Sequence, residues 1–94
     1  DKLFEILSTS TGSCWAINSY CPIEGVGPKS PADNGFKPGF SVNLMYKDLN
    51  IALKAIESTG TSACFGKKAQ ESFKKMVDEK KGSLDFSAIT MFNK

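Results

Sequence analysis

The chain has 94 residues, of which 12 are basic and 10 acidic, and its net charge at pH 7 is +2. This length, with 40% hydrophobic residues, is typical of one globular domain with a modest core. All twelve basic residues are lysine. Because arginine is the usual reader of guanine and phosphate, its absence argues against a nucleic-acid partner. No apolar stretch approaches the roughly 18 residues that a membrane helix needs, so we expect no membrane partner either.

The cysteine and histidine content excludes several kinds of site. Histidine is absent, which rules out histidine-containing zinc sites and any Ser–His or Cys–His catalytic pair. The three cysteines, Cys14, Cys21 and Cys64, do not form a Cys-x-x-Cys motif. We therefore predict no metal site and three reduced thiols, as in an intracellular protein, while a Cys14–Cys21 bridge stays open.

The first third of the chain predicts one short helix and one long loop. Leu3, Phe4 and Leu7 have helical spacing, and the helix should stop in the Ser/Thr-rich run at 8–12. Residues 12–40 hold all four prolines and five of the eight glycines, so we predict no regular structure there. This segment also carries aromatic residues, which disordered segments lack, so we expect it to be ordered against a partner surface.

The remainder of the chain predicts helices. A long helix should follow Gly39 and close at 58–60, and Thr61 or Ser62 should cap the next one, which should end at 80–82. The predicted apolar positions are Met45, Leu49, Ala52, Leu53 and Ile56 in the first, and Phe65, Ala69, Phe73, Met76 and Val77 in the second. Asp85 is a predicted N-cap of a last short helix. No segment alternates as a strand does. The predicted fold is all-α, a small helical bundle with one long ordered loop.

Three features allow two interpretations each. On a helical wheel Lys47 points away from the apolar face and Asp48 lies at its flank. They are either a solvated lysine with a dipole-favourable acid, or part of a first turn that faces a cleft of another domain. Trp15 is either core or a ligand platform. The lysines of the helix that follows residue 62 form a solvated face or meet an acidic partner.

Three stretches together resemble a known family. They are Gly12-Ser13-Cys14-Trp15 with Tyr20 and Pro22 behind it, then Gly39-Phe40 with Leu44-Met45-x-Lys47-Asp48-Leu49, and finally 84–89, which begins Leu-Asp-Phe-Ser. The chain is similar to the C-terminal domain of the 3-hydroxyisobutyrate dehydrogenases, members of the β-hydroxyacid dehydrogenase family, which is related in fold to 6-phosphogluconate dehydrogenases.

This resemblance implies that residues 1–94 are a single helical C-terminal domain. The parent enzyme would use NAD to oxidise 3-hydroxyisobutyrate to methylmalonate semialdehyde in valine breakdown. The Rossmann domain and the helix with the catalytic lysine would precede Asp1. The chain would then hold no catalytic residue, would be inactive by itself, and would not bind NAD alone.

The resemblance also assigns site residues and partners. Lys47 and Phe40 would bind the cofactor, and Trp15, Tyr20 and Asp48 would line the substrate cleft. The partners would be the Rossmann domain of the same enzyme, a small 3-hydroxy acid and further copies in a homo-oligomer. The location would be the mitochondrial matrix in a eukaryote and otherwise the cytoplasm. Two alternatives remain: a sister reductase of tartronate, glyoxylate or succinate semialdehyde, and a non-catalytic helical interaction module.

Overall fold

The computed structural model describes residues 1–92, and all regular structure in that range is helical. The elements are α1 (Lys2–Ser8), α2 (Trp15–Tyr20), the 3₁₀ helix η1 (Pro31–Asn34), α3 (Val42–Thr59), α4 (Cys64–Asp78) and the 3₁₀ helix η2 (Phe86–Met91). The predicted all-α class is confirmed. Within the described range no helix has the length and apolar character needed to cross a membrane.

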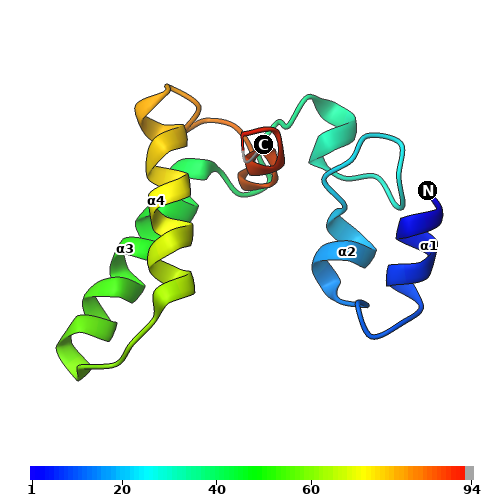
Figure 1. Ribbon diagram of the computed structural model, residues 1–94. Helices are drawn as coiled ribbons and strands as arrows, with labels where there is room; N and C mark the ends of the chain where they lie inside the picture. The colour runs from blue at the N-terminus through cyan, green and yellow to red at the C-terminus, as the bar shows by residue number, and fades with distance from the viewer. Residues whose placement is uncertain (93–94) are drawn as a thin grey trace.

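The helices form an arch with two arms (Figure 1). One arm consists of α1 and α2, the other of the antiparallel pair α3 and α4, and η2 lies between them, in contact with α4 and η1. The radius of gyration is 14.7 Å, whereas a compact domain of this length would have about 12 Å. The fold is therefore more open than the small bundle that the sequence predicts.

The segment 12–40, predicted to lack regular structure, contains both α2 and η1, so that prediction is wrong. Residues 15–20 include no proline or glycine, and a helix of six residues fits between the turns on either side. Pro31 opens η1, where its missing N–H costs nothing. The sequence also predicts that this loop is ordered, and hydrogen bonds to Asp33 agree with that. Its carboxylate accepts from the amides of Gly25 and Ser30, both at 2.8 Å.

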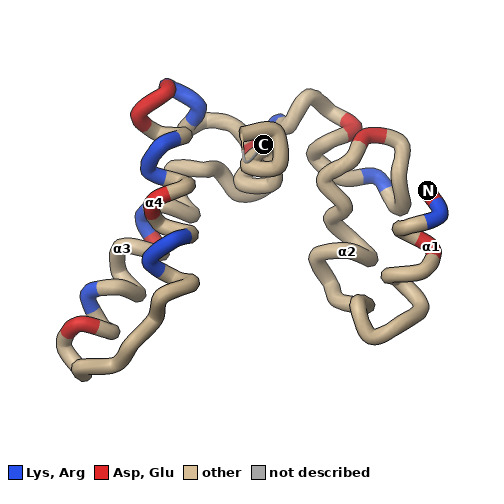
Figure 2. The backbone as a smooth tube through the Cα atoms, in the orientation of Figure 1, with Lys and Arg blue, Asp and Glu red and all other residues tan. Residues whose placement is uncertain are grey.

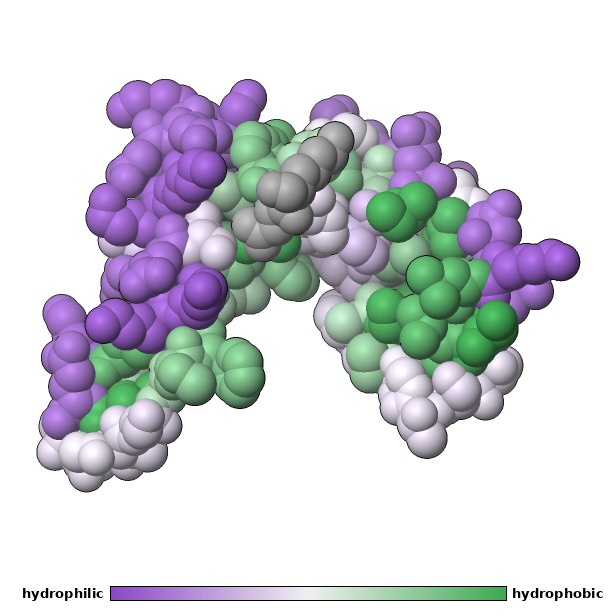
Figure 3. Space-filling view, viewed as in Figure 1, coloured by the Kyte–Doolittle hydropathy of each residue, from purple (hydrophilic) through white to green (hydrophobic). Residues whose placement is uncertain are grey.

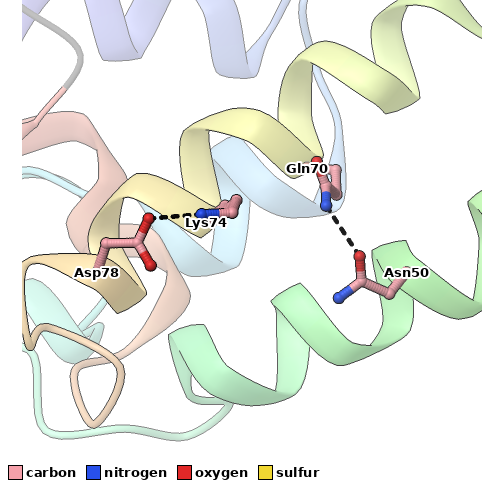
Figure 4. A network of polar contacts seen from close by, with 4 residues as sticks. All are labelled: Asn50, Gln70, Lys74 and Asp78. Atoms are coloured by element: carbon pink, nitrogen blue, oxygen red, sulfur yellow. Dashed lines mark hydrogen bonds and ion pairs between the residues drawn. The ribbon is translucent and has the colours of Figure 1, made fainter.

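The α3–α4 arm holds most of the core. Its fully or nearly buried hydrophobic residues form one cluster with η2, made of Val42, Phe73, Met76 and Ala88. A hydrogen bond of 2.9 Å from Gln70 Nε2 to Asn50 Oδ1 links the two helices, and Lys74 pairs with Asp78 along α4 (Figure 4).

Two details of the predicted apolar faces are wrong. Phe65, placed in the buried stripe of α4, is 88% exposed, and Ala52 of α3 is also exposed. Both positions have the correct helical spacing. Spacing, however, shows only which side of a helix a residue is on, not whether another element covers that side. Near the tip of the α3–α4 hairpin, nothing in residues 1–92 covers Phe65.

Charge is concentrated on the α3–α4 arm, mainly along α4 (Figure 2). The six lysines of α4 and the turn after it are all exposed, and two of them pair with acids one turn further on, Lys74 with Asp78 and Lys75 with Glu79. This arrangement agrees with the interpretation of a solvated face.

The two ends of α4 differ from their predicted form. The N-cap is Ala63, which has no capping side chain, instead of Thr61 or Ser62. The helix ends at Asp78, before the lysine pair. Lys80 then adopts a left-handed conformation with φ 63°. The amide of Lys80 donates to Val77 O and that of Lys81 to Met76 O, which is the Schellman pattern with lysine where glycine is usual.

We expect Lys80→Gly to raise the free energy of unfolding by roughly 0.5–1 kcal/mol, because glycine adopts this conformation without the Cβ penalty. The matched change is Gly60→Ala at the end of α3, where φ is 66° and no atom crowds the new Cβ. It should lower stability by about 1 kcal/mol through backbone strain alone. Urea unfolding followed by circular dichroism measures both. A neutral or destabilising Lys80→Gly would contradict the left-handed assignment.

The chain around η2 fixes the centre of the arch. Residues 40–43 run antiparallel to 82–86, with hydrogen bonds of 2.8 Å from Val42 N to Leu84 O and from Phe86 N to Phe40 O. Asp85 is confirmed as the N-cap of the last helix, since its carboxylate accepts from Ser87 N at 3.0 Å, although that helix is 3₁₀. These hydrogen bonds hold the start of α3 against the segment 82–86.

Much apolar surface remains outside the core. Figure 3 shows apolar side chains over the α1–α2 arm. The same view shows a hollow between the two arms. The large exposed hydrophobic residues are Leu3, Ile6, Trp15, Ile23, Leu44, Ile51, Phe65 and Met91. Exposed apolar surface of this extent is typical of a chain that packs against another domain or subunit.

Candidate functional site

Four aromatic rings form a continuous row at the centre of the arch. Trp15 stacks on Tyr20 with ring centres 5.1 Å apart, Tyr20 stacks on Phe86 at 5.4 Å, and Phe40 and Phe86 pack edge to face at 6.0 Å. We name these four residues the aromatic row. The structure thus brings together three of the residues predicted for the site, through Phe86, which the sequence did not single out.

Trp15 is the exposed end of this row. It is the first residue of α2, one of its faces rests on Tyr20, and 64% of the residue is exposed. The alternative that Trp15 is a core residue is therefore wrong. Tyr20, Phe40 and Phe86 are only partly exposed. The row presents a flat apolar face outward and is anchored at its inner end.

Asp85 provides that anchor. It is 0% exposed. Its Oδ1 accepts hydrogen bonds from Tyr20 Oη at 2.9 Å, Gly39 N at 3.0 Å and Phe40 N at 3.1 Å. Its Oδ2 accepts from the amide and the hydroxyl of Ser87. Each oxygen of this buried carboxylate is thus satisfied by donors from the chain.

The protonation states of Tyr20 and Asp85 follow from their surroundings. Burial, the hydrogen bond to Asp85 and the negative charge of that carboxylate raise the pKa of Tyr20 to about 12. Burial by itself would raise the pKa of Asp85, but hydrogen bonds from Ser87, Phe40 and Tyr20 outweigh it and lower that pKa. At neutral pH Tyr20 is a phenol and Asp85 a carboxylate. The Tyr20 hydroxyl is committed to Asp85, and the Tyr20 ring supports Trp15 from behind.

Lys47 and Asp48 form a second feature, near the start of α3. Lys47 Nζ lies 3.0 Å from Asp48 Oδ1, and the two side chains are 59% and 51% exposed. An ion pair this exposed stabilises a fold by only about 0–1 kcal/mol. The predicted outward direction of Lys47 is confirmed. In residues 1–92 no hydrogen bond or ring contact joins this pair to the aromatic row.

The first amides of α3 are not free to bind an anion. Val42 N donates to Leu84 O, Asn43 N donates to Gly82 O, and Leu44 N donates to the Oγ of the N-cap Ser41. A phosphate would therefore find no donors at this helix terminus, although helix N-termini often bind phosphate. The cationic group on offer here is the ammonium of Lys47.

An open apolar groove lies beside the aromatic row. Its volume is about 230 Å³, and it runs between α2 and η2, with Ala16, Ile17, Tyr20 and Phe86 among its lining residues.

Cys14, Cys21 and Cys64 form no disulfide. In the part of the chain that the structure describes, no group of three His, Cys, Asp or Glu side chains is placed to hold a metal ion.

This arrangement around Asp85 has little local signature in the sequence. Asp85 was expected to be a helix cap, and its contact with Tyr20, 65 positions away, has no local signature. The one available sign was an acidic residue between Leu84 and Phe86 in an apolar stretch, where a charge is tolerated only if it is paired.

Comparison with known proteins gives a consistent result. The family described as "NAD-binding of NADP-dependent 3-hydroxyisobutyrate dehydrogenase" matches residues 1–92. A probable 3-hydroxyisobutyrate dehydrogenase of Mycobacterium tuberculosis is 45% identical over 88 residues, which is 94% of this chain and 30% of that protein. The enzyme of Pseudomonas aeruginosa is 40% identical over 93% of this chain and 30% of its own length. The mitochondrial enzyme of Rattus norvegicus is 33% identical over 96% of this chain and 27% of its own length.

A solved structure agrees in fold as well as sequence. It is the Mycobacterium tuberculosis 3-hydroxyisobutyrate dehydrogenase with L-serine, 43% identical, with a TM-score of 0.89 over 98% of this chain and 32% of that one. The chain thus spans about 30% of the length of these relatives. It belongs to the 3-hydroxyisobutyrate dehydrogenase family.

Proposed function

We propose that this chain is the helical C-terminal domain of an NAD-dependent 3-hydroxyisobutyrate dehydrogenase, which oxidises 3-hydroxyisobutyrate to methylmalonate semialdehyde. The observation that carries the proposal is the anchored aromatic row with its exposed end at Trp15. A rigid, outward-facing apolar wall is what a second domain needs in order to complete a small substrate cleft. In this proposal the chain contributes cleft wall and charge, and the catalytic groups lie elsewhere in the enzyme.

The residues assigned to the cofactor are suited to touch NAD but not to enclose it. Lys47 gives one of its donors to Asp48 and keeps others for an oxygen-bearing group of the cofactor. Phe40 supplies an apolar ring that packs edge to face with Phe86. When bound, NAD would supply the hydride acceptor. Because the first amides of α3 are occupied, the phosphates would have to be held by a Rossmann domain, and we expect no NAD binding to this chain alone.

The residues assigned to the substrate suit a small branched 3-hydroxy acid. The exposed face of Trp15, backed by the ring of Tyr20, gives an apolar wall for a methyl branch. The carboxylate of Asp48 accepts hydrogen bonds and would suit a substrate hydroxyl. The substrate carboxylate is negatively charged, and the Lys47 ammonium beside Asp48 offsets the repulsion between the two acids.

The exposed apolar residues suit two protein partners. We assign them to packing against the Rossmann domain of the same enzyme and against further copies in a homo-oligomer. Relatives named as mitochondrial and relatives from bacteria both occur. The proposed location is therefore the mitochondrial matrix for a eukaryotic source and the cytoplasm for a bacterial one.

The test is NADH formation, followed by absorbance, with the intact dehydrogenase and with the 94-residue chain alone. We expect the intact enzyme to prefer 3-hydroxyisobutyrate to glycerate and 4-hydroxybutyrate, and the chain alone to give no NADH. Preference for another acid would indicate that the chain is instead a domain of a sister reductase. Turnover by the chain alone would contradict the domain assignment. An intact protein inactive on every acid with either nicotinamide cofactor would favour a non-catalytic module.

A further inference from the structure

We infer that Asp85 is a positioning residue that sets the place of the aromatic wall and ties it to the start of α3. It acts through Tyr20 and touches no ligand itself. The catalytic consequence rests on the proposed function, but the structural consequence does not.

One atom, Asp85 Oδ1, joins both arms of the arch. Asp85 Oδ1 accepts the hydroxyl of Tyr20, which ends α2, and the amides of Gly39 and Phe40, which precede α3. These donors come from α2 in one arm and from the segment that leads into α3 of the other arm. The position of the Tyr20 ring relative to α3, and so to Lys47, therefore depends on this oxygen.

The Asp85 side chain is itself held against rotation. Its Oδ2 is held by the amide and the hydroxyl of Ser87, so the plane of the carboxylate is fixed. Its backbone amide donates to Phe36 O at 2.8 Å, and the next amide, of Phe86, donates to Phe40 O at 2.8 Å. A fully buried side chain with both its oxygens and its backbone engaged is a rigid reference point.

The glycine at position 39 is a separate feature that favours the same contact. A Cβ added there would lie 2.8 Å from the Tyr20 hydroxyl oxygen and 3.8 Å from Asp85 Oδ1. Only glycine leaves room for the hydroxyl to reach the carboxylate at this point. The close approach of three separate segments indicates that the Tyr20–Asp85 bond is built into the fold.

The consequence for the wall follows from the stacking. Tyr20 lies between Trp15 and Phe86, so a displaced Tyr20 ring removes the support on which Trp15 rests. Trp15 has little other burial to hold it, since it is mostly exposed. Loss of the Tyr20 hydroxyl should therefore loosen the substrate-facing ring without removing any ring from the site.

The structural test uses the 94-residue chain, in which Trp15 is the only tryptophan and so the only source of its spectroscopic signal. We expect Tyr20→Phe, Asp85→Asn and Gly39→Ala each to weaken the near-ultraviolet circular dichroism of Trp15 and to raise its quenching by acrylamide. The control is Tyr46→Phe, which alters the other tyrosine and should leave both signals unchanged. A Tyr20→Phe chain with folded far-ultraviolet spectra and wild-type Trp15 signals would overturn the inference.

A titration of Tyr20 tests the Tyr20–Asp85 hydrogen bond in a second way. In the Tyr46→Phe background Tyr20 is the only tyrosine, and its ionisation at 295 nm should have a pKa of about 12. Adding Asp85→Asn removes the negative charge and should lower that pKa toward its ordinary value near 10. A pKa of Tyr20 that does not respond to Asp85→Asn, in a chain still folded at that pH, would also overturn the inference.

Kinetics of the intact dehydrogenase test the catalytic consequence. Tyr20→Phe should raise the KM for 3-hydroxyisobutyrate by about 5-fold or more and change kcat by less than about 2-fold, because wall position affects substrate binding. Adding Asp85→Asn to Tyr20→Phe should cost less than the sum of the single changes. If Trp15 signals respond but the enzyme lacks this activity, the positioning role stands and the proposed function fails. If the enzyme is active and neither KM nor Trp15 responds, the positioning role fails alone.

Discussion

Replacing Asp85 with alanine is expected to remove at least about 3 kcal/mol from the free energy of unfolding. The change would leave the Tyr20 hydroxyl and the amides of Gly39 and Phe40 without their acceptor at a partly buried site, and the amide of Ser87 without its acceptor at a buried one. An unsatisfied buried donor costs about 1–3 kcal/mol. A small domain has only about 5–15 kcal/mol in total, so the alanine variant should be close to unfolded at room temperature.

Two further variants show whether this loss belongs to the buried carboxylate. Asp85→Asn keeps the shape and one acceptor oxygen, so it should lose less stability than alanine does. Asp78→Ala removes an exposed acid whose one ion-pair partner in residues 1–92 is Lys74, and it should cost less than about 1 kcal/mol. Urea unfolding followed by circular dichroism measures all three. An Asp85→Ala chain as stable as Asp78→Ala would contradict the anchoring role.

The stabilisation that Asp85 provides should also depend on pH and be lost in acid. The pKa of Asp85 is lower in the folded chain than its ordinary value. Its stabilising effect is therefore present above the unfolded pKa, near 4, and is lost as pH falls through the lower folded pKa. Hydrogen bonds from Gly25 and Ser30 lower the pKa of Asp33 as well. The share due to Asp85 is the difference in acid sensitivity between wild type and Asp85→Asn.

The helices that the sequence predicted well are those whose signals are local. Helical spacing and the closing Gly60 located α3, and spacing located α4 to within a few residues. The proline and glycine content of 12–40 does not predict α2, because that composition describes the whole segment, whereas the stretch between Gly12 and Pro22 has neither residue and is long enough for six helical residues. Phe65 was misassigned because periodicity carries no information about which element covers a face.

The site divides in the same way. The outward direction of Lys47 followed from helix geometry, which is regular enough to assign a face from spacing. The grouping of Trp15, Tyr20 and Phe40 came only from family resemblance. Its physical basis, a ring of Phe86 between two of them and one buried carboxylate behind them, depends on contacts across more than 40 residues. No spacing rule reaches that far.

The second large effect is expected at Lys47, where alanine should lower the kcat/KM of the intact dehydrogenase at least ~10-fold, about 1.4 kcal/mol of transition-state stabilisation. The reason is that Lys47 supports little within this chain. Its one partner in the described residues is the neighbouring Asp48, and both side chains are mostly exposed. A cation held outward on a rigid helix should act mainly on a bound cofactor or substrate, so stability should change by less than about 0.5 kcal/mol.

The matched control is Lys54→Ala on the same helix. Seven residues is about two turns, so Lys54 lies on nearly the same side of α3 as Lys47 and is also exposed. A general electrostatic effect on anionic ligands would lower kcat/KM in both variants, whereas a direct contact would lower it only at Lys47. Lys47→Arg keeps the charge and should recover part of the rate if charge is what matters. Wild-type kinetics for Lys47→Ala would leave Lys47 as a solvated surface residue and remove it from the cofactor site.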